Sequence, residues 1–131
     1  MKRYWDSSAL IEALHDEALR GQITKSSSKT RPHSLSEVFS TLTKGVNFRY
    51  EADDAAKMIT DLAADMEFVE LTPEDTLAAI QQARCLGVRG ARIHDLMHAT
   101  AAKKCGAEEL VTLDKAGFET LKLSGMKLVV P

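Results

Sequence analysis

The fold is decided by residues 89–114, which read RGARIHDLMHATAAKKCGAEELVTLD. This pattern predicts a loop, then a helix that starts near Asp95 and stops at Gly106, then a short strand at 109–113. The small alanine side chains inside the helix allow it to lie close against a sheet. Asp114 follows the strand, and in open α/β folds ligands bind beyond the carboxyl ends of parallel strands. Taken singly, Asp95 would be a helix cap and Asp114 a turn residue, so the question is whether other acids join them.

Length and composition are those of an ordinary globular domain. The chain has 131 residues, 44% of them hydrophobic and 27% charged, and we expect a single domain over residues 1–131. The net charge of −2 gives no overall basic signature, so any contact with nucleic acid would be local. Cys85 and Cys105 have no partner at metal-ligand spacing. With no secretory signal and no apolar run of membrane-spanning length, we expect reduced thiols in a cytoplasmic protein that does not contact a membrane.

Helices alternate with short strands along the chain, which predicts an α/β sandwich with a mostly parallel central sheet. The strands are expected at residues 2–5, 67–71, 109–113 and 126–130, with a brief further strand at 30–34 and a loop at 24–29. The helices are expected at residues 8–20, 34–45, 51–66, 72–87, 95–106 and 115–123. Three starts carry capping signals: Ser7 or Ser8 for the first helix, Ser34 with Glu37 for the second, and Thr72 before a proline for the fourth.

Four acids come just after a predicted strand or in an early helix turn. Asp6 ends the first strand and Asp114 ends the strand at 109–113, whereas Glu37 and Asp95 lie early in their helices. In a parallel sheet all four can face the same edge. Carboxylates gathered in one pocket repel and raise each other's pKa unless a cation is present, and hard divalent ions such as Mg²⁺ favour oxygen ligands. The sequence therefore predicts a metal site.

The same residues give the chain a resemblance to the PIN-domain family, and more narrowly to its VapC-like toxin ribonucleases. The motifs that carry it run in order over nearly the whole chain: DSSAL at 6–10, SEV at 36–38, IHD at 93–95, and TLD at 112–114 with Phe118. Each motif alone is short, but the ordered set is more specific. The resemblance implies a PIN-like three-layer α/β/α sandwich with a mostly parallel central sheet.

The resemblance also implies a site and an activity. The acidic quartet that would hold Mg²⁺ or Mn²⁺ is Asp6, Glu37, Asp95 and Asp114. Ser8 and Thr112 would orient these acids by hydrogen bonding. A toxin of this kind hydrolyses RNA phosphodiesters, is usually a homodimer, and is restrained by an antitoxin that places a basic side chain in the acidic pocket. The cleaved RNA would carry a 5′-phosphate and a 3′-hydroxyl.

Two positions depart from the family pattern. Lys2 and Arg3 occupy a first strand that is usually apolar in this family. Gly117 stands where many relatives carry an acid or another polar residue, just before the phenylalanine. The second departure leaves open whether the site holds one ion or two.

Nearby basic residues admit two interpretations. His94 and His98 have the spacing of a metal-ligand pair on a helix, although a pair with one interfacial and one exposed histidine is the more common arrangement. Arg84, Arg89 and Arg92 flank the approach to Asp95 and could hold an RNA backbone, because phosphate contacts supply most of the affinity for nucleic acid. The alternative for these arginines is an ordinary solvated loop.

Other functions make different demands on the residues around Asp6. A haloacid-dehalogenase-type phosphatase needs a second aspartate two positions later, where Ser8 stands. A receiver domain needs paired acids near its N-terminus, and Asp6 has no acidic neighbour. The remaining alternative is a non-catalytic PIN-like module that binds RNA or another protein.

Overall fold

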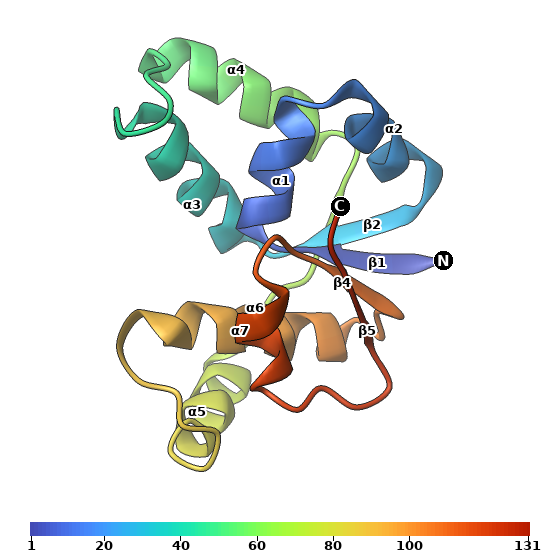
Figure 1. Ribbon diagram of the computed structural model, residues 1–131, viewed down its shortest axis with the longest axis vertical. Coiled ribbons are helices and arrows are strands. Elements are labelled where there is room, and N and C mark those ends of the chain that lie inside the picture. The colour runs from blue at the N-terminus through green and yellow to red at the C-terminus, as the bar shows by residue number, and fades with distance from the viewer.

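The computed structural model describes residues 1–131 and contains one five-stranded sheet in which every strand pair is parallel (Figure 1). The strands are β1 (Lys2–Trp5), β2 (Ser27–Thr30), β3 (Glu67–Phe68), β4 (Glu109–Val111) and β5 (Lys127–Val129). Their order across the sheet is β3-β2-β1-β4-β5. The chain first builds outward from β1 to β3 and then places β4 and β5 on the other side of β1. The topological switch point, where open α/β sheets bind ligands, therefore lies between β1 and β4.

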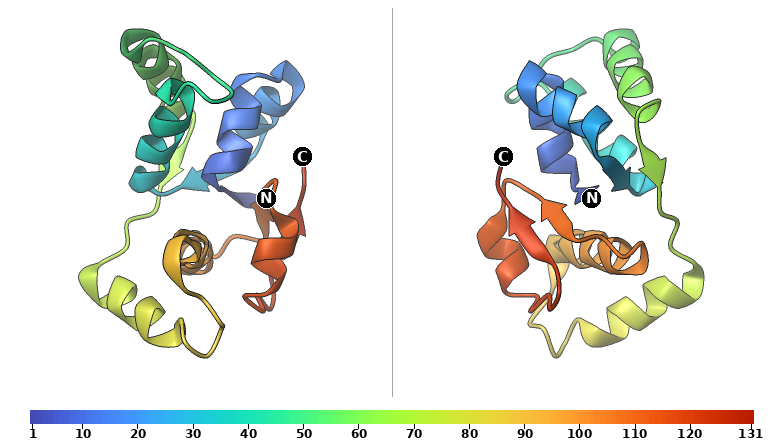
Figure 2. Two further views of the ribbon diagram at one scale, coloured as in Figure 1. Left: turned by 60° about the vertical axis from the view of Figure 1, so that its left-hand side comes forward. Right: turned by 90° about the vertical axis from the view of Figure 1, so that its right-hand side faces the viewer.

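Helices cover both faces of this sheet (Figures 1 and 2). They are α1 (Ser7–Leu14), α2 (Glu17–Lys25), α3 (Pro32–Thr43), α4 (Ala52–Ala63), α5 (Pro73–Gln82), α6 (Ile93–Lys104) and α7 (Lys115–Glu119), with a 3₁₀ turn at Gly90–Arg92. Helices α1 to α4 lie on one face, and α5 to α7 lie on the other. The predicted three-layer α/β/α sandwich is thus confirmed. None of the helices combines the length and the apolar character that crossing a bilayer requires.

The core forms on both faces of the two central strands, because neighbouring side chains of a strand point to opposite faces. Tyr4 of β1 and Leu110 of β4 pack among the helices α5 to α7, whereas Trp5 and Val111 pack among α1 to α4. Only the second half of β1 enters the core. Arg3 lies in the first half of β1 and is partly exposed, and its Nε is 2.7 Å from the Glu109 carboxylate. The basic start of this strand is therefore compatible with a central position in the sheet.

Elements with strong local signals lie where the sequence predicts them. Thr72 and Asp75 form a reciprocal capping box at the start of α5, with N–H to oxygen distances of 3.0 and 2.9 Å. Gly106 follows α6 with φ of +69°, and its N–H and that of Ala107 donate to carbonyls of the last helical turn. The predicted strand at 67–71 and the predicted helix at 115–123 are both present with shorter bounds.

The predicted single helix to residue 20 is wrong. The chain breaks at His15 and Asp16, and the Asp16 carboxylate accepts from the Leu19 N–H at 3.0 Å to begin α2. Gly21 consequently lies inside α2 and does not stop a helix. The cap of α1 is Asp6 and not one of the two serines that follow it.

The predicted loop at 24–29 and the predicted brief strand after it are also wrong. The strand lies earlier, as β2, and α3 begins at Pro32 two residues before the predicted cap Ser34. Ser28 and Thr30 are buried in β2, where hydrogen bonds satisfy their hydroxyls: the Trp5 indole N–H donates to Ser28 at 3.2 Å, and Thr30 donates to the Trp5 carbonyl at 2.8 Å. These tertiary contacts stabilise a strand that its own polar sequence does not favour.

Candidate active site

Asp6 follows β1 directly, and hydrogen bonds hold both of its carboxylate oxygens. Its Oδ1 accepts from the Ser8 hydroxyl at 2.7 Å and from the Ala9 N–H at 2.9 Å, which caps α1. Its Oδ2 accepts from the Thr112 hydroxyl at 2.5 Å. Asp6 as a whole is 4% exposed. This carboxylate is therefore fixed at the carboxyl end of β1 before any ligand is considered.

Thr112 connects Asp6 to the second strand-end acid. The same Thr112 Oγ1 accepts from the Asp114 N–H at 2.9 Å, and the Asp114 carboxylate accepts from the Gly117 N–H at 3.0 Å to cap α7. A side chain at Gly117 would collide with the Asp114 carboxylate in this position. The absence of a side chain at Gly117, the position that departs from the family pattern, therefore leaves room for the Asp114 carboxylate to cap α7.

Asp95 lies in the first turn of α6 without capping it, and its carboxylate is half-buried. Burial raises the pKa of Asp95 above its ordinary value, and the charges of Asp114 and Asp6 raise it further. The charges of His98 and Arg92 oppose this shift. Asp6 and Asp114 are therefore near enough to Asp95 for their charges to disfavour its ionised form.

Glu37 approaches the same region from α3 in a different environment. Its Oε1 lies 2.9 Å from the His98 Nε2, and its Oε2 accepts from the Ser7 hydroxyl at 3.4 Å. Burial alone would raise the pKa of Glu37, but the hydrogen bond and charge of His98, together with the charges of His33 and His94, hold that pKa below its ordinary value. Glu37 is thus stabilised as a carboxylate, whereas the aspartate on α6 is destabilised.

The two histidines of α6 do not form a metal-ligand pair. His98 is 2% exposed, and both of its ring nitrogens have protein partners, because Nδ1 lies 2.8 Å from the Tyr4 hydroxyl and Nε2 faces Glu37. His94 is exposed, and its ring stacks on that of His33 with centroids 5.8 Å apart. The structure matches the expectation of one interfacial and one exposed histidine. The contact of His98 with Tyr4 and Glu37 was not predicted.

Of the three arginines expected near the site, the structure brings only Arg92 to it. Arg92 donates to the Gly117 carbonyl at 3.1 Å and to the Thr120 hydroxyl at 2.5 Å, which ties the start of α6 to α7. Arg84 and Arg89 are exposed in the segment between α5 and the 3₁₀ turn, and neither is ion-paired with an acid. A role for these two in binding RNA remains a prediction.

The donor set fits a hydrated hard cation better than a closed cage. No three side chains among histidine, cysteine, aspartate and glutamate are spaced to bind a metal directly. No lysine or arginine forms an ion pair with Asp6, Asp95 or Asp114. Mg²⁺ binds through one or two carboxylates and keeps several waters, so it does not need a preformed set of direct ligands. Three aspartates without an ion pair to lysine or arginine are compatible with such an ion.

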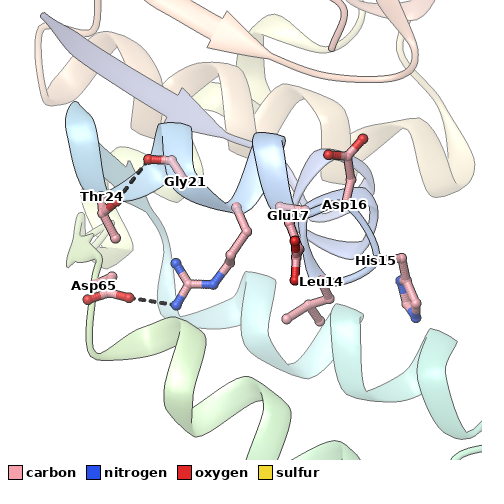
Figure 3. Close-up of a pocket in the computed structure, with 9 residues that line it drawn as sticks. Leu14, His15, Asp16, Glu17, Gly21, Thr24 and Asp65 are labelled. Atoms are coloured by element: carbon pink, nitrogen blue, oxygen red, sulfur yellow. Dashed lines mark hydrogen bonds and ion pairs between the residues drawn. The ribbon is translucent and has the colours of Figure 1, made fainter.

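A separate surface depression of about 570 Å³ lies at the turn between α1 and α2 (Figure 3). Asp16, Glu17 and Thr24 line it, and an ion pair of 2.6 Å between Arg20 and Asp65 crosses it. None of the four predicted site acids lines this depression. Its charged groups belong to the cap of α2 and to the contact between α2 and α4, so it is not the predicted site.

Fold and site together define a class of α/β/α sandwich with carboxylates gathered at the switch point of a parallel sheet. Within that class, a family profile described as "PIN domain" matches residues 3–122, and the chain belongs to the PIN domain family. Membership of this family supports nuclease activity. No curated protein sequence matches the chain.

Solved structures with the same fold include VapBC proteins. VapBC2 from Rickettsia felis, bound to a DNA fragment from its promoter, aligns over 100% of this chain and 99% of its own, with 15% identity and a TM-score of 0.73. PAE2754 from Pyrobaculum aerophilum aligns over 98% and 90%, with 19% identity and a TM-score of 0.74. DNA-bound VapBC from Salmonella typhimurium aligns over 99% and 98%, with 17% identity and a TM-score of 0.72. At these identities the similarity shows a shared fold.

Proposed function

We propose that the chain, acting as a single domain, is a Mg²⁺- or Mn²⁺-dependent endoribonuclease and the toxin of a toxin–antitoxin pair. The observation that carries the proposal is that the charges of Asp114 and Asp6, after burial, raise the pKa of Asp95, while none of the three aspartates forms an ion pair with a lysine or arginine. A bound cation would relieve this repulsion. Membership of the PIN domain family supports the nuclease activity.

We assign two proposed roles to the four acids. Asp6, Asp95 and Asp114 would hold the ion, and Glu37 would be a further ligand or a base acting through water. When bound, the ion would activate a water and neutralise the charge that builds on the phosphoryl oxygens. Ser8 and Thr112 hold the Asp6 carboxylate through the hydrogen bonds described above, so that it does not have to reorganise when the ion binds.

The direct test is cleavage of a panel of structured RNAs with Mg²⁺, with Mn²⁺, and with either ion plus a chelator. We expect cleavage that needs the ion, leaves 5′-phosphate ends, and is abolished by Asp95→Asn. Asp53→Asn is the matched control, because Asp53 is an exposed aspartate on α4 outside the cluster. Cleavage that persists in chelator would contradict the metal mechanism. Absence of cleavage of every RNA would favour the non-catalytic PIN-like module.

An antitoxin partner is proposed because two of the similar structures are VapBC complexes. Such a partner would place a basic side chain among the aspartates and compete with the ion. The neighbouring reading frames should be inspected for a small DNA-binding protein, and its product should be co-purified with this chain. We expect a stable complex in which cleavage is suppressed and is restored when the partner is removed.

Self-association is the other proposed interaction. Leu77 and Ile80 lie three residues apart on α5, where they are 59% and 48% exposed, and a second copy of the chain would cover them. Leu77→Glu should therefore convert a homodimer into a monomer in analytical ultracentrifugation. A toxin that cleaves the RNA of its own cell would act in the cytoplasm, and this localisation stays a prediction.

A further inference from the structure

We infer that His98, held in turn by Tyr4, is a positioning residue that fixes the carboxylate of Glu37 so that its second oxygen is left on the side of Ser7, next to Asp6. The inference rests on the proposed function, because it assigns Glu37 a working orientation in that site. It adds two residues, Tyr4 and His98, that belong to neither the acidic quartet nor the supporting hydroxyls.

The contact between His98 and Glu37 determines where one imidazole proton lies. The His98 Nε2 is 2.9 Å from the Glu37 Oε1. An ionised carboxylate has no proton to donate, so Nε2 must carry the hydrogen of this bond. Oε1 is therefore committed to the histidine. The other oxygen, Oε2, lies 3.4 Å from the hydroxyl of Ser7, the residue directly after Asp6. It is the oxygen that remains for an ion or a water.

The contact between His98 and Tyr4 fixes the opposite side of the ring. The Tyr4 hydroxyl is 2.8 Å from the His98 Nδ1, and Tyr4 is completely buried. A phenol has an ordinary pKa of about 10, so the Tyr4 hydroxyl carries its proton at neutral pH. Whenever the ring is neutral and carries its hydrogen on Nε2, Nδ1 is an acceptor and the Tyr4 hydroxyl donates to it. The hydroxyl thus favours the tautomer in which Nε2 faces Glu37 with its hydrogen.

Packing alone does not explain a histidine at this position. The neighbouring inward positions of α6 are apolar: Leu96, Met97, Ala99, Ala101 and Ala102. An apolar side chain at position 98 would fill the space without two polar partners, whereas a buried imidazole must have both nitrogens satisfied to avoid a desolvation cost. The three members of the connection come from β1, α6 and α3, and the free oxygen of the last one lies 3.4 Å from the hydroxyl of Ser7, the residue after Asp6. Hydrogen bonds of this kind orient metal-ligating carboxylates.

The test compares His98→Leu with His98→Gln in the full chain. Leucine removes both hydrogen bonds, whereas a glutamine amide can still donate to Glu37 and accept from Tyr4. We expect His98→Leu to lower Mn²⁺ affinity or kcat for RNA cleavage roughly ten- to a hundredfold without changing KM for RNA. We expect His98→Gln to recover most of that loss. Mn²⁺ binding is measured by titration calorimetry and by the Mn²⁺ electron paramagnetic resonance signal.

A double-mutant cycle separates positioning from a structural effect. If His98 acts through Glu37, then adding His98→Leu to Glu37→Gln should change affinity and kcat by no more than about twofold. An equal loss in both backgrounds would overturn the inference, as would a His98→Gln variant as impaired as His98→Leu. Should His98→Leu fail to fold, Tyr4→Phe removes only the hydroxyl, and its loss must likewise disappear in the Glu37→Gln background.

The same measurements distinguish this inference from the proposed function. A wild-type chain that neither binds Mn²⁺ nor cleaves RNA would overturn both. A wild-type chain that binds and cleaves, accompanied by folded His98→Leu and Tyr4→Phe variants with unchanged affinity and kcat, would overturn the positioning role alone.

Discussion

Asp95→Asn should make the metal-free protein more stable while abolishing RNA cleavage. The substitution keeps the shape of the side chain and removes one charge from the cluster. Because burial and then the charges of Asp114 and Asp6 raise the pKa of Asp95, its ionised form destabilises the fold at neutral pH. The destabilisation disappears once the pH falls below the ordinary pKa of an aspartate, since the carboxyl is then protonated in both the folded and the unfolded chain.

The gain in the free energy of unfolding should be about 1 kcal/mol at neutral pH, the usual scale of a single-residue effect. Asp95 is only half-buried, so solvent screens part of the repulsion, and His98 and Arg92 offset another part. For a domain of this size that gain raises the melting temperature by roughly 4 °C. Mn²⁺ at a hundred times its dissociation constant would stabilise the wild-type chain by about 2.7 kcal/mol and should reverse the order of the two proteins.

The assay is thermal unfolding of both proteins in chelator and in Mn²⁺, at neutral pH and at a pH below the range of aspartate, with RNA cleavage measured in parallel. Asp53→Asn serves as the control and should change neither quantity appreciably. A variant that is less stable than wild type in chelator at neutral pH would refute the repulsion. A variant that still cleaves RNA would refute the catalytic role of Asp95.

Three further variants test residues in and around the site. Thr112→Val removes the hydroxyl that bridges the two strand-end aspartates and should cost about 1 to 3 kcal/mol of stability in urea unfolding; an unchanged midpoint would argue against the bridge. Replacing Arg84 and Arg89 by alanine should weaken RNA binding and flatten its salt dependence while Mn²⁺ binding is unchanged, as measured by fluorescence anisotropy at two salt concentrations. Gly117→Ala should displace the Asp114 carboxylate from its cap and cost about 1 kcal/mol; a variant as stable as wild type would show that the cap is dispensable.

The parts of the fold that the sequence predicts correctly depend on interactions between residues close together in the chain. Thr72 and Asp75 cap α5 from three positions apart, and Gly106 ends α6 through its own φ. Signals of this kind are present in the sequence whatever the rest of the chain does. The placement of Asp6 and Asp114 at one edge follows similarly, because Asp6 comes directly after β1 and Asp114 comes three residues after the last residue of β4.

The parts that could not be predicted depend on contacts between distant segments. The polar strand β2 exists because Ser28 and Thr30 bond to Trp5 and pair with β1, and no local pattern shows this. The contact between Tyr4 and His98 joins residues 94 positions apart. The sequence holds a weak signal for this contact. Tyr4 and Trp5 are neighbours in a strand and must face opposite sides of the sheet, so only one of the two can contact α6.

The strand-end aspartates have in this structure the ordinary capping role that a single such acid usually has, and their role at a metal site stays a prediction. Asp6 caps α1, and Asp114 caps α7. A cap contributes about 1 kcal/mol to stability, which is comparable to the repulsion expected among half-screened carboxylates. The caps therefore offset part of the cost of holding these charges together. They also fix the side-chain rotamers of Asp6 and Asp114 in which the proposed ion would bind them. Asp95 caps nothing and has its pKa raised, so it is the acid for which the metal-free state has no compensating bond. For this reason Asp95 is the residue whose substitution most clearly separates stability from activity.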